Sequence, residues 1–146
     1  MIRRLLVNDG MITLTLDDLF QEIGGSMKTF DSIRTVESRA VQIWQILVGL
    51  AYNRQTITYE KLSKLLGFKG AGTMGKFLDP IMKYCKLNGL PPLTVLVVGK
   101  YLGVPGGGLI TVKDADLERE QVYDYDWFNV YPPDETEFAQ ALTAKL

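Results

Sequence analysis

The segment between residues 36 and 53 constrains the fold of this chain more than any other feature. Its apolar residues follow helical spacing on two adjacent faces, so most of the circumference of such a helix is apolar. A helix of this kind is stable when it is buried on most sides. The segment therefore predicts the central helix of the core, with Trp44 as a core residue and ligand stacking by Trp44 as the alternative. The first face carries Val41, Trp44, Leu47, Val48 and Ala51, and the second carries Ile43, Ile46 and Leu50.

Two residue counts exclude whole classes of chemistry. The chain has no histidine, which excludes a Ser-His-Asp triad, a Cys-His pair and every metal site that needs imidazole. Cys85 is the only cysteine, so an intramolecular disulfide and a cysteine-cluster metal site are excluded as well. We expect Cys85 to be a buried, unreactive apolar residue. We predict no catalytic residue, no bound metal and no cofactor.

The length and the apolar pattern set the expected class of protein. A chain of 146 residues is typical of one compact domain. No apolar run reaches the roughly 18 residues that a membrane helix needs. The apolar run near the amino terminus has three residues, Leu5-Leu6-Val7, which is too short for a signal peptide. We therefore expect a cytoplasmic protein without a membrane partner.

Turn and cap signals predict the elements before and after the central helix. Residues 1–14 are predicted to form a β-hairpin with Asp9-Gly10 as its turn, and Thr15 to begin a helix that ends at Gly24-Gly25. Thr58 is the expected N-cap of a helix over 58–66, with Gly67 as its C′ residue. We expect the side chains of this helix that face the core to be Leu62, Leu65 and Leu66.

Asp79-Pro80 interrupts the next helical pattern. Proline disfavours helical backbone at the residue before it and suits the first position of a helix. We therefore predict a helix over 71–78 and a second one from Asp79 to Asn88, with Gly89 as its stop.

The rest of the chain alternates strand and helix signals. The β-branched run 93–98 predicts a buried strand, a glycine-rich loop follows, and 109–112 predicts a short return strand. Residues 114–123 are predicted to form an acidic helix, and Asp134 to begin a last helix that ends near residue 144. The predicted core packs together Trp44, Leu47, Leu62, Leu65, Phe77, Ile81 and Val95.

These elements together predict an α+β fold, a mainly helical single domain over 1–146 with a winged helix-turn-helix core. In this scheme, residues 1–34 form an amino-terminal hairpin and arm, residues 36–112 form the core with a small β-hairpin wing, and residues 113–146 form an acidic, aromatic tail packed on the core. The helix after the tight turn is the one that lies against DNA in such proteins.

Charge is segregated along the chain although the net charge is −1. Residues 54–110 carry eight basic residues against two acidic ones, whereas residues 111–146 carry three basic residues against nine acidic ones. Such segregation creates a local positive field. Two interpretations follow: the basic surface is open for a polyanion, or it pairs with the acidic half inside the fold.

Two further patterns do not predict catalytic sites. Gly70-Ala-Gly72-Thr-Met-Gly75 matches G-x-G-x-x-G, but a dinucleotide site needs a strand before the first glycine, and here a helix precedes it. The acidic residues after Asp114 could hold a divalent metal in a nuclease, but their alternation spreads them around a helix, so we interpret them as a solvated acidic face. These acids are Asp114, Asp116, Glu118, Glu120, Asp124 and Asp126.

The predicted DNA-facing region carries lysines and small hydroxyl groups. Lys69, Thr73 and Lys76 lie at the start of the second helix of the pair, and lysine suits phosphate contact better than base reading. Because no Arg or Asn is available there for a bidentate base contact, we expect weak sequence specificity. Lys100 and Tyr101 in the wing complete the basic surface.

The segment from Ile57 to Gly108 resembles the carboxyl-terminal domain of alkylguanine DNA alkyltransferases and the alkyltransferase-like proteins. The matching motifs are Ile57-Thr-Tyr59-Glu-Lys-Leu62-Ser-Lys-Leu65, Gly72-Thr-Met-Gly75, Leu90-Pro-Pro-Leu-Thr-Val-Leu-Val-Val98 and the glycines 106–108. The resemblance covers about 50 residues and implies a winged-helix fold and a DNA backbone contact by Tyr59. The piece from Leu90 to Gly108, with the tail 124–128, also looks like small uncharacterised bacterial proteins.

The chain differs from this family at the residues that carry out alkyl transfer, which excludes that reaction. The acceptor cysteine and its histidine would fall near Leu96, Val97 and Val98, which provide neither a thiolate nor a base. The base-displacing arginine of the family would fall near Gly72, so base flipping is also in doubt.

The sequence therefore predicts a non-catalytic DNA-binding protein from a bacterium or phage. The predicted DNA contacts are Tyr59, Lys69, Thr73, Lys76, Lys100 and Tyr101. The alternative is a protein-interaction module whose basic face meets an acidic partner, as a homodimer or as an accessory subunit of a defence or restriction system. A metal-dependent nuclease is the third hypothesis.

Overall fold

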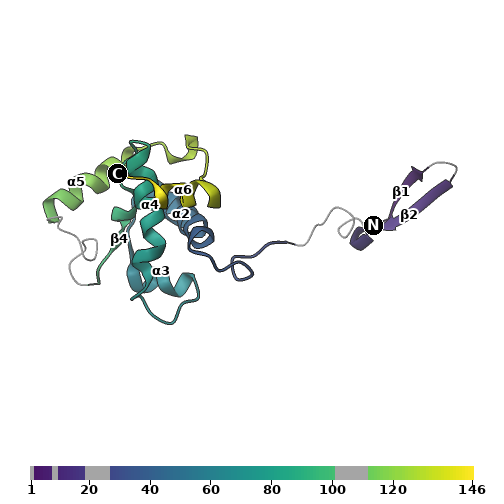
Figure 1. Cartoon of the computed structure of the whole chain (residues 1–146), viewed down its shortest axis with the longest axis horizontal. Coiled ribbons are helices and arrows are strands. Elements are labelled where there is room, and N and C mark those ends of the chain that lie inside the picture. Colours follow the sequence, from purple (N-terminus) through teal and green to yellow (C-terminus); the bar gives the residue numbers. More distant parts are fainter. Residues whose placement is uncertain (1, 8–9, 19–26, 101–111) are drawn as a thin grey trace. The chain divides into compact units, whose positions relative to one another are not determined.

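The structure is a computed structural model that describes residues 2–7, 10–18, 27–100 and 112–146. The chain divides into two compact units, Met1–Ser32 and Ile33–Leu146, and each is described by itself (Figure 1). Within the described residues the secondary structure is mostly helical with two small sheets, which confirms the predicted α+β class.

The first unit contains an antiparallel hairpin of β1 (Ile2–Val7) and β2 (Gly10–Thr15). The prediction that Asp9-Gly10 forms the turn is wrong, because Gly10 belongs to β2 and pairs with Val7. The observed register instead places the apolar residues Leu5 and Leu6 opposite Ile12 and Met11. Thr15 caps a helical turn over 16–18 as predicted: its hydroxyl accepts from the Asp18 amide at 3.2 Å.

The second unit is organised around α2 (Val36–Tyr52), which confirms the predicted central helix. Thr35 is its N-cap and accepts a hydrogen bond from the amide of Ser38 at 3.0 Å. α4 (Met74–Leu87) and α6 (Glu135–Thr143) pack against α2 and against each other. Trp44 lies at this junction, with its ring 5.7 Å from Tyr84 and 6.2 Å from Phe138.

The predicted break at Asp79-Pro80 is wrong, because α4 continues through Pro80. Proline removes one helical hydrogen bond and clashes with the carbonyl four residues earlier, which costs about 3 kcal/mol. Burial compensates for this cost, since Pro80 is itself fully buried and its helix neighbours Phe77 and Ile81 belong to the core. Gly89 ends the helix at φ +65°, as predicted.

The short helix α3 (Tyr59–Leu65) begins and ends as predicted. The hydroxyl of Thr58 accepts from the amide of Lys61 at 3.2 Å, and Gly67 has φ +78°. The prediction that Leu65 faces the core is wrong, because its exposed fraction is 63%. The buried stripe of α3 is centred on Leu62 and Ser63, so Leu65 lies at the side of the helix.

The predicted strand over 93–98 is wrong in its first part. Leu93–Leu96 form the 3-10 helix η1, and only Val97–Val98 form a strand, β4. β4 pairs in parallel with β3 (Ile57–Thr58), with Ile57 opposite Val97. The apolar run is buried in either conformation, and burial alone does not distinguish a strand from a helical turn. Of the predicted wing, residues 101–111 lie outside the described residues, and Val112, the predicted end of the return strand, is helical instead.

The acidic half of the chain contains α5 (Val112–Asp124), the 3-10 helix η2 (Trp127–Asn129) and α6. The indole of Trp127 lies 5.7 Å from that of Trp44, and its N–H donates to the Val122 carbonyl at 2.7 Å. Asp134 and Glu137 form a capping box that begins α6, which confirms the predicted start of this helix.

The core of the second unit contains every predicted core residue except Leu65. Cys85 is buried as predicted, and burial raises the pKa of its thiol to about 11. Among the residues that the structure describes, no helix is long and apolar enough to cross a membrane.

Candidate nucleic-acid interface

The amino-terminal end of α4 brings together three of the predicted DNA contacts. Lys69, Thr73 and Lys76 are all exposed there. Neither lysine forms an ion pair with any part of the chain that the structure describes. The Nζ of Lys76 lies 5.0 Å from the ring centroid of Phe77, which holds the ammonium against the surface of the helix.

The first turn of α4 adds positive potential to these lysines. Thr73 is its N-cap residue, but its side chain makes no capping hydrogen bond, and the first turn contains no acidic residue. The Met74 amide donates to the Ala71 carbonyl at 3.2 Å. The amide groups of a first turn carry partial positive charge, which attracts anions. This end of α4 is therefore electropositive through both its backbone and its side chains.

The loop over 66–73 is fixed from the inside by two side chains that the sequence analysis did not single out. The Ser63 hydroxyl donates to the Gly70 carbonyl at 2.7 Å. Arg39, whose exposed fraction is 3%, donates through Nη1 to the Leu66 carbonyl at 3.3 Å. The signal that identifies Arg39 is its position, because it is the one cation in the apolar helix α2.

Aromatic packing completes the support of this loop. The rings of Phe68 and Phe77 stack with centroids 5.0 Å apart. The guanidinium of Arg39 lies 5.0 Å from the centroid of Phe68, so the same cation contacts both the loop backbone and its aromatic residue. Lys69 directly follows this fixed residue, and its position on the surface therefore depends on the core.

A second group of basic residues lies at the start of α3. The pairing of Thr58 with Val98 brings the end of β4 beside this helix. The pKa of Glu60 is lowered by its hydrogen bond and ion pair with Lys64, at 3.2 Å, and further by the positive charge of Lys100. Lys100 therefore lies near Glu60 in the first turn of α3, which begins at the half-buried Tyr59. Tyr101 lies outside the described residues.

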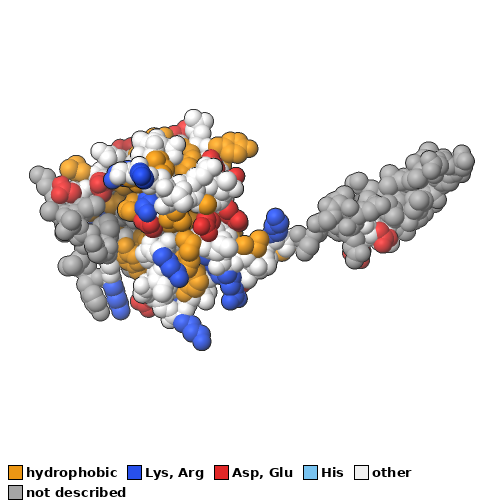
Figure 2. Space-filling model, in the orientation of Figure 1, with side chains coloured by type: hydrophobic (Ala, Val, Ile, Leu, Met, Phe, Trp, Pro, Cys, Tyr) orange, Lys and Arg blue, Asp and Glu red, His pale blue; other side chains and the backbone are white. Residues whose placement is uncertain are grey.

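The remaining lysines of α4 divide into two kinds. Lys83 is partly buried and pairs with Asp79 at 3.0 Å, so its charge is compensated within the helix. Lys86, in the last turn, is exposed and has no ion pair in the part of the chain described. Figure 2 shows Lys and Arg side chains over α3 and the neighbouring part of α4, with apolar side chains between them.

Acidic residues of α5 form ion pairs outside the α3–α4 region. Glu120 and Asp124 both bind Arg54, which follows α2, and the Asp124 contact is 3.2 Å long. Asp116 binds Arg119 within α5 at 3.3 Å. The described residues include no cluster of three acidic or cysteine side chains that could hold a metal ion.

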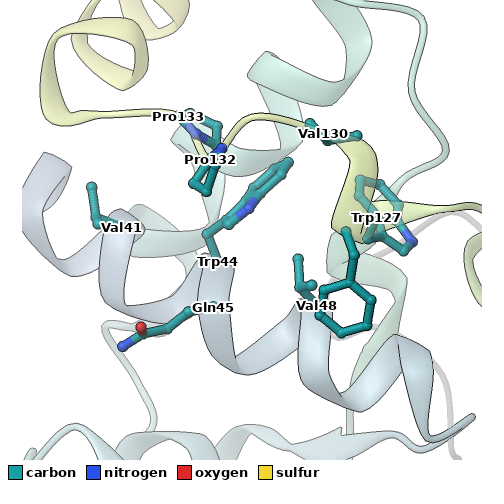
Figure 3. A pocket seen from close by; sticks show the side chains of 9 residues that line it. Val41, Trp44, Gln45, Val48, Trp127, Val130, Pro132 and Pro133 are labelled. Carbon is teal, nitrogen blue, oxygen red and sulfur yellow. The ribbon is translucent and has the colours of Figure 1, made fainter.

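A separate apolar groove lies between α2 and the segment 127–133 (Figure 3). Its volume is about 320 Å³. The side chain of Trp44 extends from α2 toward the loop that carries Pro132. Two exposed rings, Tyr52 and Phe128, contact each other with centroids 5.3 Å apart, and Phe128 lines the groove. The sequence analysis did not find this groove, which is lined by Val41, Trp44, Gln45, Val48, Trp127, Phe128, Val130, Pro132 and Pro133.

In comparisons with known proteins, no family model, no curated protein and no solved structure matches the chain. The resemblance to the alkyltransferase domain stays a prediction from the motifs.

Proposed function

We propose that this chain is a non-catalytic DNA-binding protein of winged-helix type, with α4 lying against the DNA backbone. The observation that carries the proposal is the electropositive amino-terminal end of α4. Two exposed lysines lie there that form no ion pair with the described part of the chain, together with the Thr73 hydroxyl and a first turn without a side-chain cap. The preceding loop is fixed by Ser63 and Arg39. A rigid group of donors of this kind suits phosphate oxygens.

The start of α3 provides the second part of the proposed contact surface. Tyr59 and Lys100 lie there, and Tyr101 directly follows in the sequence. The chemistry of the whole set is phosphate binding: lysine ammonium groups, hydroxyl groups and backbone amides. Binding of this type has weak sequence specificity, because phosphate contacts carry no base information.

The test is DNA binding by the full chain, measured by fluorescence anisotropy at several salt concentrations. Three lysine contacts, from Lys69, Lys76 and Lys100, give a slope of log K against log salt near −2.7. This slope is equivalent to an affinity loss of about 40-fold between about 50 and about 200 mM salt. Absence of measurable binding to duplex or single-stranded DNA at the lower concentration would contradict the proposal.

Two variants of one helix separate a site from a general charge effect. Lys76→Ala is expected to weaken binding to all duplexes alike and to reduce the slope by about one. Lys86→Ala removes the same charge from the exposed carboxyl-terminal end of α4 and is expected to leave the slope unchanged. Equal effects of the two substitutions would show that the charge acts diffusely.

The apolar groove supports the second candidate function, a protein-interaction module. Grooves lined by large apolar side chains are typical of sites for partner side chains. Tyr131, within the segment 127–133, has an exposed fraction of 92%. Under this hypothesis, Phe128→Ala weakens binding of a partner and leaves DNA binding unchanged. The groove and the α4 end are composed of different residues, so the two functions can be tested separately.

A further inference from the structure

The hairpin of the first unit presents a sheet too small to be stable alone. A two-stranded hairpin is at best marginally stable in water, and units below about 40 residues generally need a disulfide, a metal or association. The hairpin lies in the unit Met1–Ser32, which contains no cysteine. In the described part of the chain, its sheet has β1 and β2 as its strands and no third strand (Figure 1).

The register determines which backbone groups of β2 face the open edge. In a hairpin whose strands are separated by two residues, the flanking pair exchanges hydrogen bonds, and hydrogen-bonded and non-hydrogen-bonded pairs then alternate. Val7 and Gly10 form that flanking pair. Met11 and Thr13 therefore turn their amide and carbonyl groups away from β1, whereas Ile12, between them, turns its groups toward β1.

The two edges of the hairpin differ in charge. β1 contains Arg3 and Arg4, and charged residues on an edge strand oppose pairing with another strand. β2 has the sequence Gly-Met-Ile-Thr-Leu-Thr, with no charged residue and no proline. Of the two edges, that of β2 therefore has the sequence that favours strand addition.

Strand length indicates which partner fits this edge. A six-residue edge is best satisfied by a strand of equal length, and β3 and β4 have two residues each. Among the described strands, the one of equal length that also lacks charge is β2 itself. We infer that β2 pairs in antiparallel fashion with β2 of a second copy of this chain, which joins the two hairpins into one four-stranded sheet across a twofold axis.

In one register of this pairing, the amide and carbonyl groups of β2 that face away from β1 form hydrogen bonds with the second copy. The Thr15 amide donates to the Asp18 carboxylate at 3.0 Å, so it is not available to a partner strand. Met11 and Thr13 remain, and they pair with each other across the axis when Ile12 lies on it. Ile12 then faces Ile12 of the second copy as a non-hydrogen-bonded pair, with a Cα separation of about 4.5 Å.

Cysteine cross-linking of the full chain tests this register. Ile12→Cys is expected to form a covalent dimer with oxidised glutathione, twice the 16.4 kDa of the chain, because the predicted Cα separation suits a disulfide. Met11→Cys is the matched control: its equivalent positions would lie about 8 Å apart, beyond disulfide reach. The native Cys85 does not interfere, because it is buried. Equal cross-linking of both variants, or none in the Ile12 variant, would overturn the register.

Proline substitutions test the edge without cross-linking. Thr13→Pro removes an outward amide of β2, and Arg4→Pro removes the matching amide of β1, since Arg4 and Thr13 are paired. Because of the twofold axis, Thr13→Pro removes two intermolecular hydrogen bonds from the dimer. It is therefore expected to weaken the dimer about 10- to 100-fold, and Arg4→Pro much less. Sedimentation velocity between about 1 and about 100 µM measures both. A monomeric parent chain, or equal weakening by the two prolines, would overturn the inference.

Discussion

The basic end of α4 and the apolar groove are two surfaces of one compact unit, yet their residues come together in different ways. The basic surface is formed by neighbours in the sequence, with Lys69, Thr73 and Lys76 inside eight consecutive positions. The groove joins α2 to the segment 127–133, which begins 75 residues after α2 ends at Tyr52. A charged surface formed by sequence neighbours can therefore be predicted from the sequence, whereas a groove between distant segments cannot.

Both surfaces depend on α2. Trp44 lines the groove, and Arg39, on the same helix, holds the loop that carries Lys69. The shape of the groove thus depends on apolar packing. The position of the basic end of α4 depends on the buried guanidinium of Arg39 and its hydrogen bonds. Substitutions in α2 can separate these two kinds of support.

The largest expected effect is that of Trp44→Ala. Trp44 has an exposed fraction of 3% and contacts the rings of Tyr84, Trp127 and Phe138. Its truncation leaves a cavity under the groove, so we expect the free energy of unfolding to fall by about 3–5 kcal/mol. Urea unfolding followed by circular dichroism measures this loss. A loss below about 1 kcal/mol would show that the groove and the core are independent.

Much of the fold follows from local signals in the sequence. Thr58 and Asp134 cap α3 and α6, and Gly67 and Gly89 adopt positive φ where the sequence predicts helix ends. These signals act through hydrogen bonds and backbone freedom within one turn, which explains why they are visible in the sequence. The exposure of Lys69 and Lys76 is also predictable, because a charge without an ion pair in the described residues stays at the surface.

The errors arise where distant packing outweighs a local preference. Pro80 favours a break, but α4 continues because residues on both sides of it are buried in one core. The run 93–96 has strand propensity but forms η1. Leu65 is more apolar than Ser63, yet Ser63 is the buried one because its hydroxyl reaches the Gly70 carbonyl. In each case the contacts involve other parts of the fold: α4 packs against α2 and α6, η1 packs against α2, and Ser63 bonds to Gly70.

Arg39→Ala is expected to have the next largest effect. It leaves the Leu66 carbonyl without its cationic donor and removes the contact with Phe68, so the free energy of unfolding should fall by about 2 kcal/mol. The DNA affinity should fall as well, although Arg39 is buried. Arg39→Lys keeps the charge but loses the planar donor group. DNA binding by the lysine variant equal to that of the parent would show that only the charge matters.

A smaller effect is expected for the exposed aromatic pair at the groove. Tyr52 and Phe128 have exposed fractions of 72% and 67%, and their rings contact edge to face. A double-mutant cycle with alanine at both positions should give a coupling free energy of about 0.5–1 kcal/mol. Zero coupling would mean that Tyr52 does not hold the ring of Phe128, which lines the groove, in place.

The smallest effect is expected for Leu65→Ala, the substitution for which the sequence alone predicts a large loss. Leu65 is 63% exposed, so its removal creates no cavity, and the free energy of unfolding should change by less than about 0.5 kcal/mol. Leu62→Ala is the matched control on the same helix, since Leu62 is fully buried and should cost about 2–5 kcal/mol. Chemical denaturation of both variants measures the difference. A loss for Leu65→Ala as large as that for Leu62→Ala would mean that α3 presents a different face to the core. In that case Ser63 could not hold Gly70, and the basic end of α4 would lose the support that distinguishes it from an ordinary charged surface.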